Sequence, residues 1–130
     1  MTQDGRRVVL IAEDEEEIRE LLAMMFEAEG VVVLKAGDGE SALDLIRKYK
    51  GEISLLVTDL GLPKLGGIDV IHQGREIHPG LRVIAATGFG HPQVRAELRN
   101  EGVDEFFPKP FSPLELLRVA RKLLDLDPPS

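Results

Sequence analysis

Five short runs rich in Val, Ile and Leu recur along the chain. They cover residues 8–12, 31–35, 53–58, 81–86 and 103–107. The first four runs are apolar at successive positions and do not alternate with polar residues, which is typical of parallel strands covered by helices on both faces. We therefore predict five strands in a parallel sheet, the last of them shorter and more mixed in composition than the rest.

The segments between the first three runs have helical spacing. In the first segment, apolar side chains recur at i, i+3, i+4 and i+7 from Ile18 to Met25, and Gly30 is suited to the end of that helix. The second segment runs from Asp38, a favourable N-cap residue, to about residue 50. Each of these predicted strands is thus followed by an amphipathic helix.

Three further helices follow in the second half of the chain. The third covers about residues 67–77 and contains Gly74, which costs about 1 kcal/mol relative to alanine inside a helix. The fourth begins near Pro92, and the fifth begins with a capping box from Ser112 to Glu115. The order of elements is therefore (βα)₅.

This alternation predicts an α/β fold with a doubly wound, five-stranded parallel sheet in the flavodoxin-like strand order 2-1-3-4-5. A length of 130 residues suits one domain, with a core from about residue 7 to 125. In open sheets of this kind, ligands bind beyond the carboxyl ends of the strands. The candidate chemistry should therefore be sought at that edge.

Charge and composition narrow the choice of partners. The chain has 16 Lys and Arg against 23 Asp and Glu, a net charge of −7, which argues against direct nucleic-acid binding. Cysteine is absent, so disulfides and thiolate metal sites are excluded, and a reducing compartment is compatible. No apolar run approaches the length of a membrane span. We expect a soluble, cytoplasmic protein without membrane insertion.

Charged and polar residues follow four of the five predicted strands. Glu13 and Asp14 come after the first strand, Asp59 after the third, Thr87 after the fourth and Lys109 after the fifth. Carboxylates about 4 Å apart repel one another by about 4 kcal/mol at an effective dielectric constant near 20. A hard divalent cation removes this cost, and Mg²⁺ prefers one or two carboxylates together with a phosphate. The edge is therefore a candidate Mg²⁺ and phosphate site.

Each of these residues also has a simpler interpretation when it is considered alone. Asp14 suits the N-cap of the first helix, and Asp59 suits a solvated carboxylate at the end of a strand. Thr87 would make a local bond between its hydroxyl and the backbone, and Lys109 would be a surface charge. Only their convergence on one edge favours a functional site.

Several separated motifs resemble the receiver domains of two-component response regulators. They are Leu-Ile-Ala-Glu-Asp at 10–14, Val-Thr-Asp-Leu at 57–60 with Pro63 and Gly67, Ala-Thr-Gly at 86–88 and Lys-Pro-Phe at 109–111. Any one of these motifs is weak evidence. In this order and spacing they are specific, and the resemblance extends over essentially the whole chain.

The resemblance implies a role for each residue at the edge. Asp59 would accept a phosphoryl group, and Thr87 and Lys109 would contact the phosphoryl oxygens. The implied Mg²⁺ ligands are Glu13, Asp14, Asp59 and the carbonyl group of Gly61. Phe106 stands where the family has its switch aromatic, although a core phenylalanine explains it equally well. The resemblance also implies a cis peptide bond between Lys109 and Pro110.

Three residues depart from the common family pattern. Gly61 leaves open an edge that larger residues often cover, and Phe106 lacks the hydroxyl group of a tyrosine. Glu13 stands where aspartate is commoner, and its extra methylene group would let it act through a metal-bound water. The three histidines, His72, His78 and His91, have no metal-ligand spacing and predict no histidine metal site.

By resemblance, the chain is a phosphorylation-activated signalling switch. It would take a phosphoryl group from a phosphohistidine of a sensor kinase or a phosphotransfer protein, in a reaction that needs Mg²⁺, and act on a downstream protein. The loop 59–63 resembles that of receivers attached to hybrid sensor kinases. Such a switch catalyses its own phosphorylation and dephosphorylation but is not a conventional enzyme.

Two alternatives remain open at this point. One is an aspartyl-phosphate phosphohydrolase, although such enzymes usually have a second acid two residues after the nucleophile, where this chain has Gly61. The other is a module with the same fold that binds partners without being phosphorylated. Phosphorylation by a small phosphodonor distinguishes the three functions.

Overall fold

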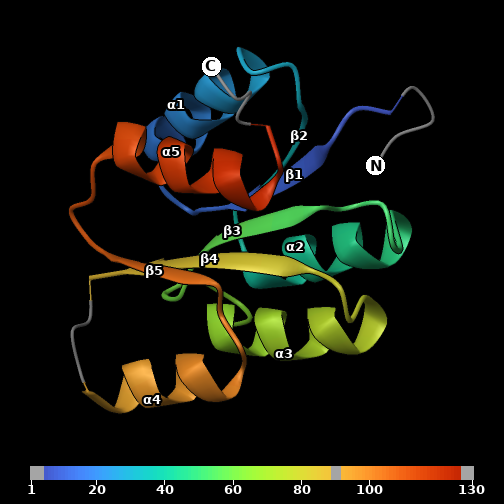
Figure 1. Ribbon diagram of the computed structural model, residues 1–130. Helices are drawn as coiled ribbons and strands as arrows, with labels where there is room; N and C mark the ends of the chain where they lie inside the picture. Colours follow the sequence, from blue (N-terminus) through green and yellow to red (C-terminus); the bar gives the residue numbers. More distant parts are fainter. Residues whose placement is uncertain (1–4, 89–91, 127–130) are drawn as a thin grey trace.

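Ten elements alternate strictly between strand and helix in the computed structural model, which describes residues 5–88 and 92–126 (Figure 1). The strands are β1 Val8–Ala12, β2 Val32–Ala36, β3 Leu55–Asp59, β4 Arg82–Thr87 and β5 Glu105–Pro108. The helices are α1 Glu16–Glu27, α2 Gly39–Lys48, α3 Gly67–Ile77, α4 Pro92–Asn100 and α5 Pro113–Leu123. The sheet has the order β2-β1-β3-β4-β5, and each neighbouring pair is parallel, so the predicted fold class is confirmed.

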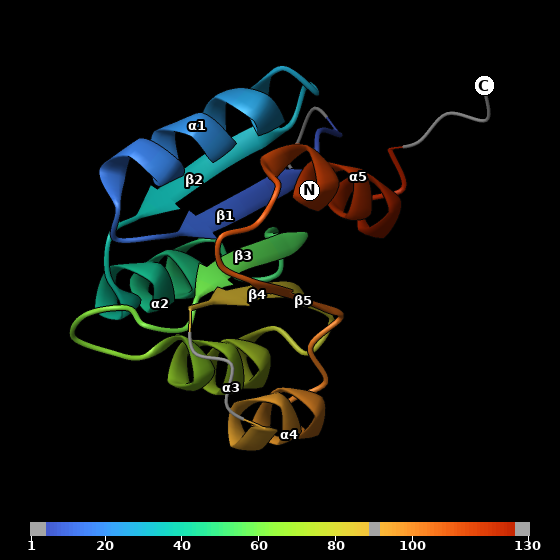
Figure 2. The same cartoon turned by 90° about the vertical axis from the view of Figure 1, so that its left-hand side faces the viewer.

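Helices cover both faces of the sheet. Helices α1 and α5 lie on one face, and α2, α3 and α4 lie on the other, as Figures 1 and 2 show. Two groups of buried side chains correspond to these layers, one around Leu10, Leu56 and Val83, and one around Phe26, Ile84 and Leu116. Because the central residues of β1, β3 and β4 are buried on both faces, the largely apolar sequence of these strands follows directly from their place in the sheet.

Eight of the ten predicted strand boundaries were wrong by one to two residues. Strands β2, β3, β4 and β5 each begin one or two residues later and end one residue later than predicted. Ile53 and Leu81 are buried but precede the hydrogen-bonded ladder, so an apolar run overstates where a strand begins. Strand β2 also differs because it is an edge strand, only half-buried along most of its length and with an exposed Lys35.

The predicted helix starts are largely confirmed. The Asp38 side chain accepts a hydrogen bond from the Ser41 amide at 2.7 Å, as expected of an N-cap residue. At α5, the Ser112 hydroxyl accepts from the Glu115 amide at 3.2 Å. This is one half of the predicted capping box, and the Glu115 carboxylate pairs with Arg118 in place of the other half. The described residues contain no helix long and apolar enough to cross a membrane.

Two glycines in α3 allow close approach. A Cβ atom on Gly74 would lie 3.0 Å from Ile46 Cδ1, so glycine lets α3 pack directly against α2. A Cβ atom on Gly67 would lie 2.4 Å from the Asp59 carbonyl oxygen, which is closer than real contacts allow. The start of α3 therefore presses against the end of β3, where Asp59 lies.

Candidate metal and phosphoryl site

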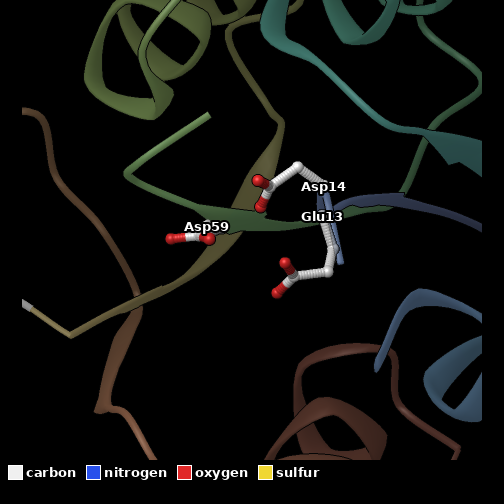
Figure 3. A group of neighbouring side chains, drawn as sticks. All are labelled: Glu13, Asp14 and Asp59. Carbon is white, nitrogen blue, oxygen red and sulfur yellow. The ribbon is translucent and has the colours of Figure 1, made fainter. Parts of the chain in front are cut away.

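Three carboxylates meet at the carboxyl edge of the sheet (Figure 3). Glu13 and Asp14 follow β1 directly, and Asp59 is the last residue of β3. Strands β1 and β3 are neighbours in register, with Ala12 opposite Thr58, so the next residues of the two segments, Glu13 and Asp59, lie side by side. One oxygen atom from each carboxylate lies within 4.8 Å of the others. The sequence-predicted acidic cluster is therefore present.

Lys109 reaches into this cluster from the end of β5. Its Nζ atom lies 2.8 Å from Glu13 Oε1 and 3.1 Å from Asp59 Oδ2. A third carboxylate, that of Glu15, lies 3.9 Å from the same ammonium group. The surface-charge interpretation of Lys109 is wrong, because only 16% of its side chain is exposed and it bridges two acidic side chains.

Backbone amides hold two of the carboxylates in place. The Glu15 amide donates to Glu13 Oε2 at 3.0 Å, and the Gly61 amide donates to Asp59 Oδ1 at 3.0 Å. Asp14 differs from both, because its side chain is exposed and the residue at the N-cap of α1 is Glu15, which makes no side-chain capping bond. The interpretation of Asp14 as the helix cap is therefore wrong, and its carboxylate remains available to a ligand.

Burial and hydrogen bonding act in opposite directions on the pKa of Glu13, and also on that of Lys109. Burial raises the pKa of Glu13, whose exposed fraction is 3%, although its hydrogen bonds to Lys109 and to the Glu15 amide act to lower it. For Lys109, burial acts to lower the pKa, but the hydrogen bonds to Glu13 and Asp59 together outweigh it and the pKa is raised. Lys109 is therefore a firmly charged group beside an acid that is costly to ionise.

Thr87 and Lys109 are tied together through the backbone. Thr87 follows Ala86, the register partner of Asp59, and is buried. Its carbonyl group accepts a hydrogen bond from the Lys109 amide at 2.8 Å. The Lys109–Pro110 peptide bond is cis, as predicted. Both residues therefore belong to the same edge as the acidic cluster.

Phe106 lies farther along the sheet, in β5, with Ala85 of β4 as its register partner. It is half-buried and lines a cavity together with Leu98, Arg99 and Val103, between α4 and β5. Its ring belongs to the apolar core on that face of the sheet. The surroundings of Phe106 are therefore those of a core phenylalanine. The cavity beside its ring leaves space for the ring to change position.

The donor set suits a hard divalent cation. The three carboxylates Glu13, Asp14 and Asp59 offer oxygen atoms only, and Lys109 neutralises one of their three negative charges. Mg²⁺ takes oxygen ligands and is usually held by one or two carboxylates together with waters and a phosphate. Two histidines lie elsewhere, His72 beside Glu101 and His78 with Nε2 3.0 Å from the Ile53 carbonyl oxygen, while His91 lies outside the described residues.

Two residues near the site escaped the strand-end reasoning. Glu15 belongs to a run of five acidic residues, 13–17, that is visible in the sequence and marks the β1–α1 turn as strongly negative. Arg19, one turn into α1, donates from Nη1 to the Glu13 carbonyl oxygen at 2.9 Å. The residues that line an apolar groove beside them are Glu15, Ile18, Leu21, Leu22, Lys109, Pro110, Phe111 and Pro113. Only the charge run could have been found from sequence alone.

Comparisons with known proteins agree with this geometry. Residues 9–121 match the family described as response regulator receiver domain. An uncharacterized 14.6 kDa protein of Leptolyngbya boryana is 32% identical over 123 residues, which cover 93% of this chain and 92% of that protein. Transcriptional regulatory protein CpxR of Escherichia coli (strain K12) is 37% identical over 116 residues, 89% of this chain and 48% of that protein.

A solved structure extends the similarity to the fold. The crystal structure of the receiver domain from the hybrid histidine kinase CckA has a TM-score of 0.76 and 29% sequence identity, and the match covers 90% of this chain and 98% of that chain. The similar proteins therefore include one of comparable length, a regulator of which this chain spans about half, and a hybrid-kinase receiver. The similarity of this chain to a hybrid-kinase receiver is therefore one of several and does not single out that kind of protein.

Proposed function

The chain belongs to the response-regulator receiver family, and from this premise we propose that Asp59 accepts a phosphoryl group from a phosphohistidine in a Mg²⁺-dependent reaction. The observation that carries the proposal is the bridge from Lys109 to both Glu13 and Asp59, with Asp14 open to solvent beside them. The donor is a histidine kinase or a histidine phosphotransfer protein. Phosphorylation then alters how the chain contacts a downstream protein.

The residues of the chain supply position and charge. An oxygen of the Asp59 carboxylate attacks phosphorus, the phosphorus–nitrogen bond of the phosphohistidine breaks, and the imidazole leaves as a neutral ring that keeps the proton the phosphohistidine carries on its other nitrogen. The Gly61 amide donates to Asp59 Oδ1. The other carboxylate oxygen, Oδ2, faces the ammonium group of Lys109. Phosphoryl transfer has a loose, in-line transition state in which catalysis is mostly positioning and charge neutralisation.

The proposed Mg²⁺ ligands are Glu13, Asp14, Asp59 and the Gly61 carbonyl group. When bound, the ion supplies positive charge against the phosphoryl oxygens. Lys109 contributes the fixed positive charge, and the Thr87 hydroxyl is the proposed neutral contact to the phosphoryl group. Movement of Thr87 toward that group, with Phe106 turning inward, would carry the signal to the face formed by α4, β5 and α5, by biasing an equilibrium between two conformations.

Acetyl phosphate with Mg²⁺, followed by intact mass measurement, tests the proposal. The wild-type protein should gain one phosphoryl group, and Asp59→Asn should gain none while keeping its circular dichroism spectrum. Asp44→Asn is the matched control, because Asp44 is an exposed carboxylate on α2 that pairs with Arg47. This variant should be labelled like wild type. Labelling of Asp59→Asn at wild-type level would place the acceptor elsewhere and end the proposal.

The same experiment separates the two alternatives. A phosphohydrolase would release phosphate from p-nitrophenyl phosphate over many turnovers without retaining a stable phosphoryl group. A module that acts without phosphorylation would show no gain in mass with acetyl phosphate or phosphoramidate. The switch is favoured if the protein gains and retains one phosphoryl group with Mg²⁺ present and gains none when Mg²⁺ is removed before the reaction.

A further inference from the structure

Arg19 is a largely buried cation that none of the roles above uses. It lies in the first turns of α1, its side chain is 20% exposed, and its Nη1 atom donates a 2.9 Å hydrogen bond to the Glu13 carbonyl oxygen. Its ion pair with Glu20, at 3.8 Å, is long, and Glu20 is held closer by Lys35 at 2.9 Å. The contact with the Glu13 carbonyl is therefore the shorter of these two interactions of the guanidinium group.

That carbonyl belongs to the peptide unit that joins Glu13 to Asp14. A peptide unit is planar, so one hydrogen bond to its oxygen fixes the orientation of the link between the two Cα atoms. On the other side of Glu13, the Glu13 amide donates to the Ala36 carbonyl oxygen at 3.0 Å. The backbone of residue 13 is thus held from β2 through its amide and from α1 through its carbonyl group.

Gly37 provides the space that the guanidinium group occupies. A Cβ atom at position 37 would lie 3.3 Å from Arg19 Nη1, which is tighter than nearly all real contacts. The turn after β1 and the turn after β2 therefore both approach the Nη1 atom of one arginine. A side chain at position 37 would require the guanidinium group to shift by a few tenths of an ångström, away from the place where it holds the carbonyl group.

We propose that Arg19 is a positioning residue for the cation site: it fixes the Glu13–Asp14 peptide so that both carboxylates face the same ion as Asp59. The proposal rests on the proposed function, because it concerns the same acidic cluster. It differs from that function in assigning a role to a residue that touches neither the ion nor the phosphoryl group.

Positioning and simple charge repulsion predict opposite results for removal of Arg19. As a positive charge near three carboxylates, Arg19 repels a divalent cation, so repulsion alone predicts that Arg19→Met binds Mg²⁺ more tightly. Loss of positioning predicts weaker binding, and removal of groups that orient metal ligands typically costs about tenfold or more in affinity. The sign of the change therefore decides between them.

The test is a Mg²⁺ titration of the unphosphorylated protein followed by amide NMR, which reports affinity and fold at once. Arg19→Met should raise the Kd for Mg²⁺ about tenfold with a dispersed, folded spectrum. Arg19→Lys, which keeps one donor, should give an intermediate Kd. Gly37→Ala leaves the arginine in place but crowds it, so it should also weaken binding, and it serves if Arg19→Met does not fold.

Arg47→Met is the matched control, because Arg47 makes an exposed ion pair with Asp44 along α2. It should leave the Kd for Mg²⁺ within about twofold of wild type, as expected of an exposed pair. An unchanged or lower Kd in both Arg19→Met and Gly37→Ala would overturn the proposal. If wild type takes up no phosphoryl group and binds no Mg²⁺, the proposed function itself fails, which is a different result from wild-type binding that Arg19 does not affect.

Discussion

Lys109 Nζ lies 3.1 Å from Asp59 Oδ2, although the two residues are 50 positions apart in the chain. The same ammonium group lies 2.8 Å from Glu13 Oε1. Two acidic side chains that are 4% and 11% exposed therefore share one cation. The lysine therefore offsets part of the repulsion between the two carboxylates.

Lys109→Met should consequently destabilise the metal-free protein. Removing the ammonium group leaves Glu13 and Asp59 facing each other, and breaking one side of a largely buried ion pair is strongly unfavourable. We expect the free energy of unfolding at pH 7 to fall by about 2 kcal/mol, measured by urea denaturation in EDTA. Mg²⁺ should restore part of the loss by supplying positive charge to the same carboxylates.

Lys35→Met is a suitable control for this prediction. Lys35 also pairs with a glutamate at 2.9 Å, but both side chains are more than two-fifths exposed. Exposed ion pairs contribute about 0–1 kcal/mol, so its loss should be small. Equal losses for the two variants would mean that burial of the Lys109 cluster carries no energetic weight.

The topology could be predicted from the sequence because it depends on composition that repeats. Largely apolar runs of five or six residues separated by amphipathic segments leave few arrangements other than a covered parallel sheet. Strand boundaries could not be predicted to the residue. They depend on backbone hydrogen bonds, and buried side chains such as Ile53 and Leu81 extend the apolar run beyond the ladder.

The candidate site was predictable to the same depth. Residues that end parallel strands must meet at one edge, so Glu13, Asp14, Asp59 and Lys109 could be grouped from their positions in the sequence alone. Arg19 and Gly37 could not, because their relationship depends on how a side chain from α1 crosses toward the turn after β2. The rule that groups residues at the ends of parallel strands does not predict residues that reach the same edge from a helix.

Glu13→Gln should gain stability relative to the metal-free wild type as the pH rises, while weakening Mg²⁺ binding. Burial raises the pKa of Glu13 in the folded protein, so folding favours its protonated form. The stability this confers is present below the unfolded pKa and is lost as the pH rises through the raised, folded pKa. Glutamine keeps the neutral form at every pH.

Urea denaturation in EDTA, from acidic to mildly alkaline pH, checks this sign. The stability of Glu13→Gln relative to wild type should increase with pH through the raised pKa and then level off. A relative stability that falls with pH would show that the bond from Lys109 outweighs burial. In a parallel titration, the variant should bind Mg²⁺ about tenfold more weakly, as expected for an altered ligand shell.

His72 should titrate above its ordinary range because of Glu101. Its Nδ1 atom lies 2.9 Å from Glu101 Oε1, and this hydrogen bond is the largest cause of the raised pKa of His72, with Glu76 a smaller one. The raised pKa stabilises the fold fully below the ordinary pKa of 6.5, and that contribution is lost as the pH rises through the folded value. NMR of the imidazole protons measures the pKa directly.

Glu101→Gln should return the pKa of His72 toward its ordinary value of about 6.5, and Glu76→Gln should lower it less. Glu76 is the matched control, because it lies on α3 with its carboxylate 3.8 Å from the same imidazole. A larger effect from Glu76→Gln would show that the contact between α3 and the end of α4 does not persist in solution.

Gly67→Ala should disturb both stability and the site, because Gly67 lies where α3 meets the acceptor strand. Its Cβ atom would stand 2.4 Å from the Asp59 carbonyl oxygen and 2.7 Å from Leu60 Cα. Both atoms are backbone, so neither can turn aside as a flexible side chain could. Relief requires α3 or the end of β3 to shift, and overpacking of this kind costs about 1–3 kcal/mol.

Gly66→Ala provides a control one residue away. The nearest atom to a Cβ at position 66 is 3.8 Å distant, and the backbone φ of −65° suits alanine. Urea denaturation followed by circular dichroism should give a loss of about 2 kcal/mol or more for Gly67→Ala and less than about 1 kcal/mol for Gly66→Ala.

If Asp59 is the acceptor, Gly67→Ala should also slow labelling by acetyl phosphate under conditions where the variant is folded, because the strand end that carries the carboxylate has moved. Wild-type labelling by a destabilised Gly67→Ala would mean that the shift is absorbed by α3 and leaves Asp59 in place.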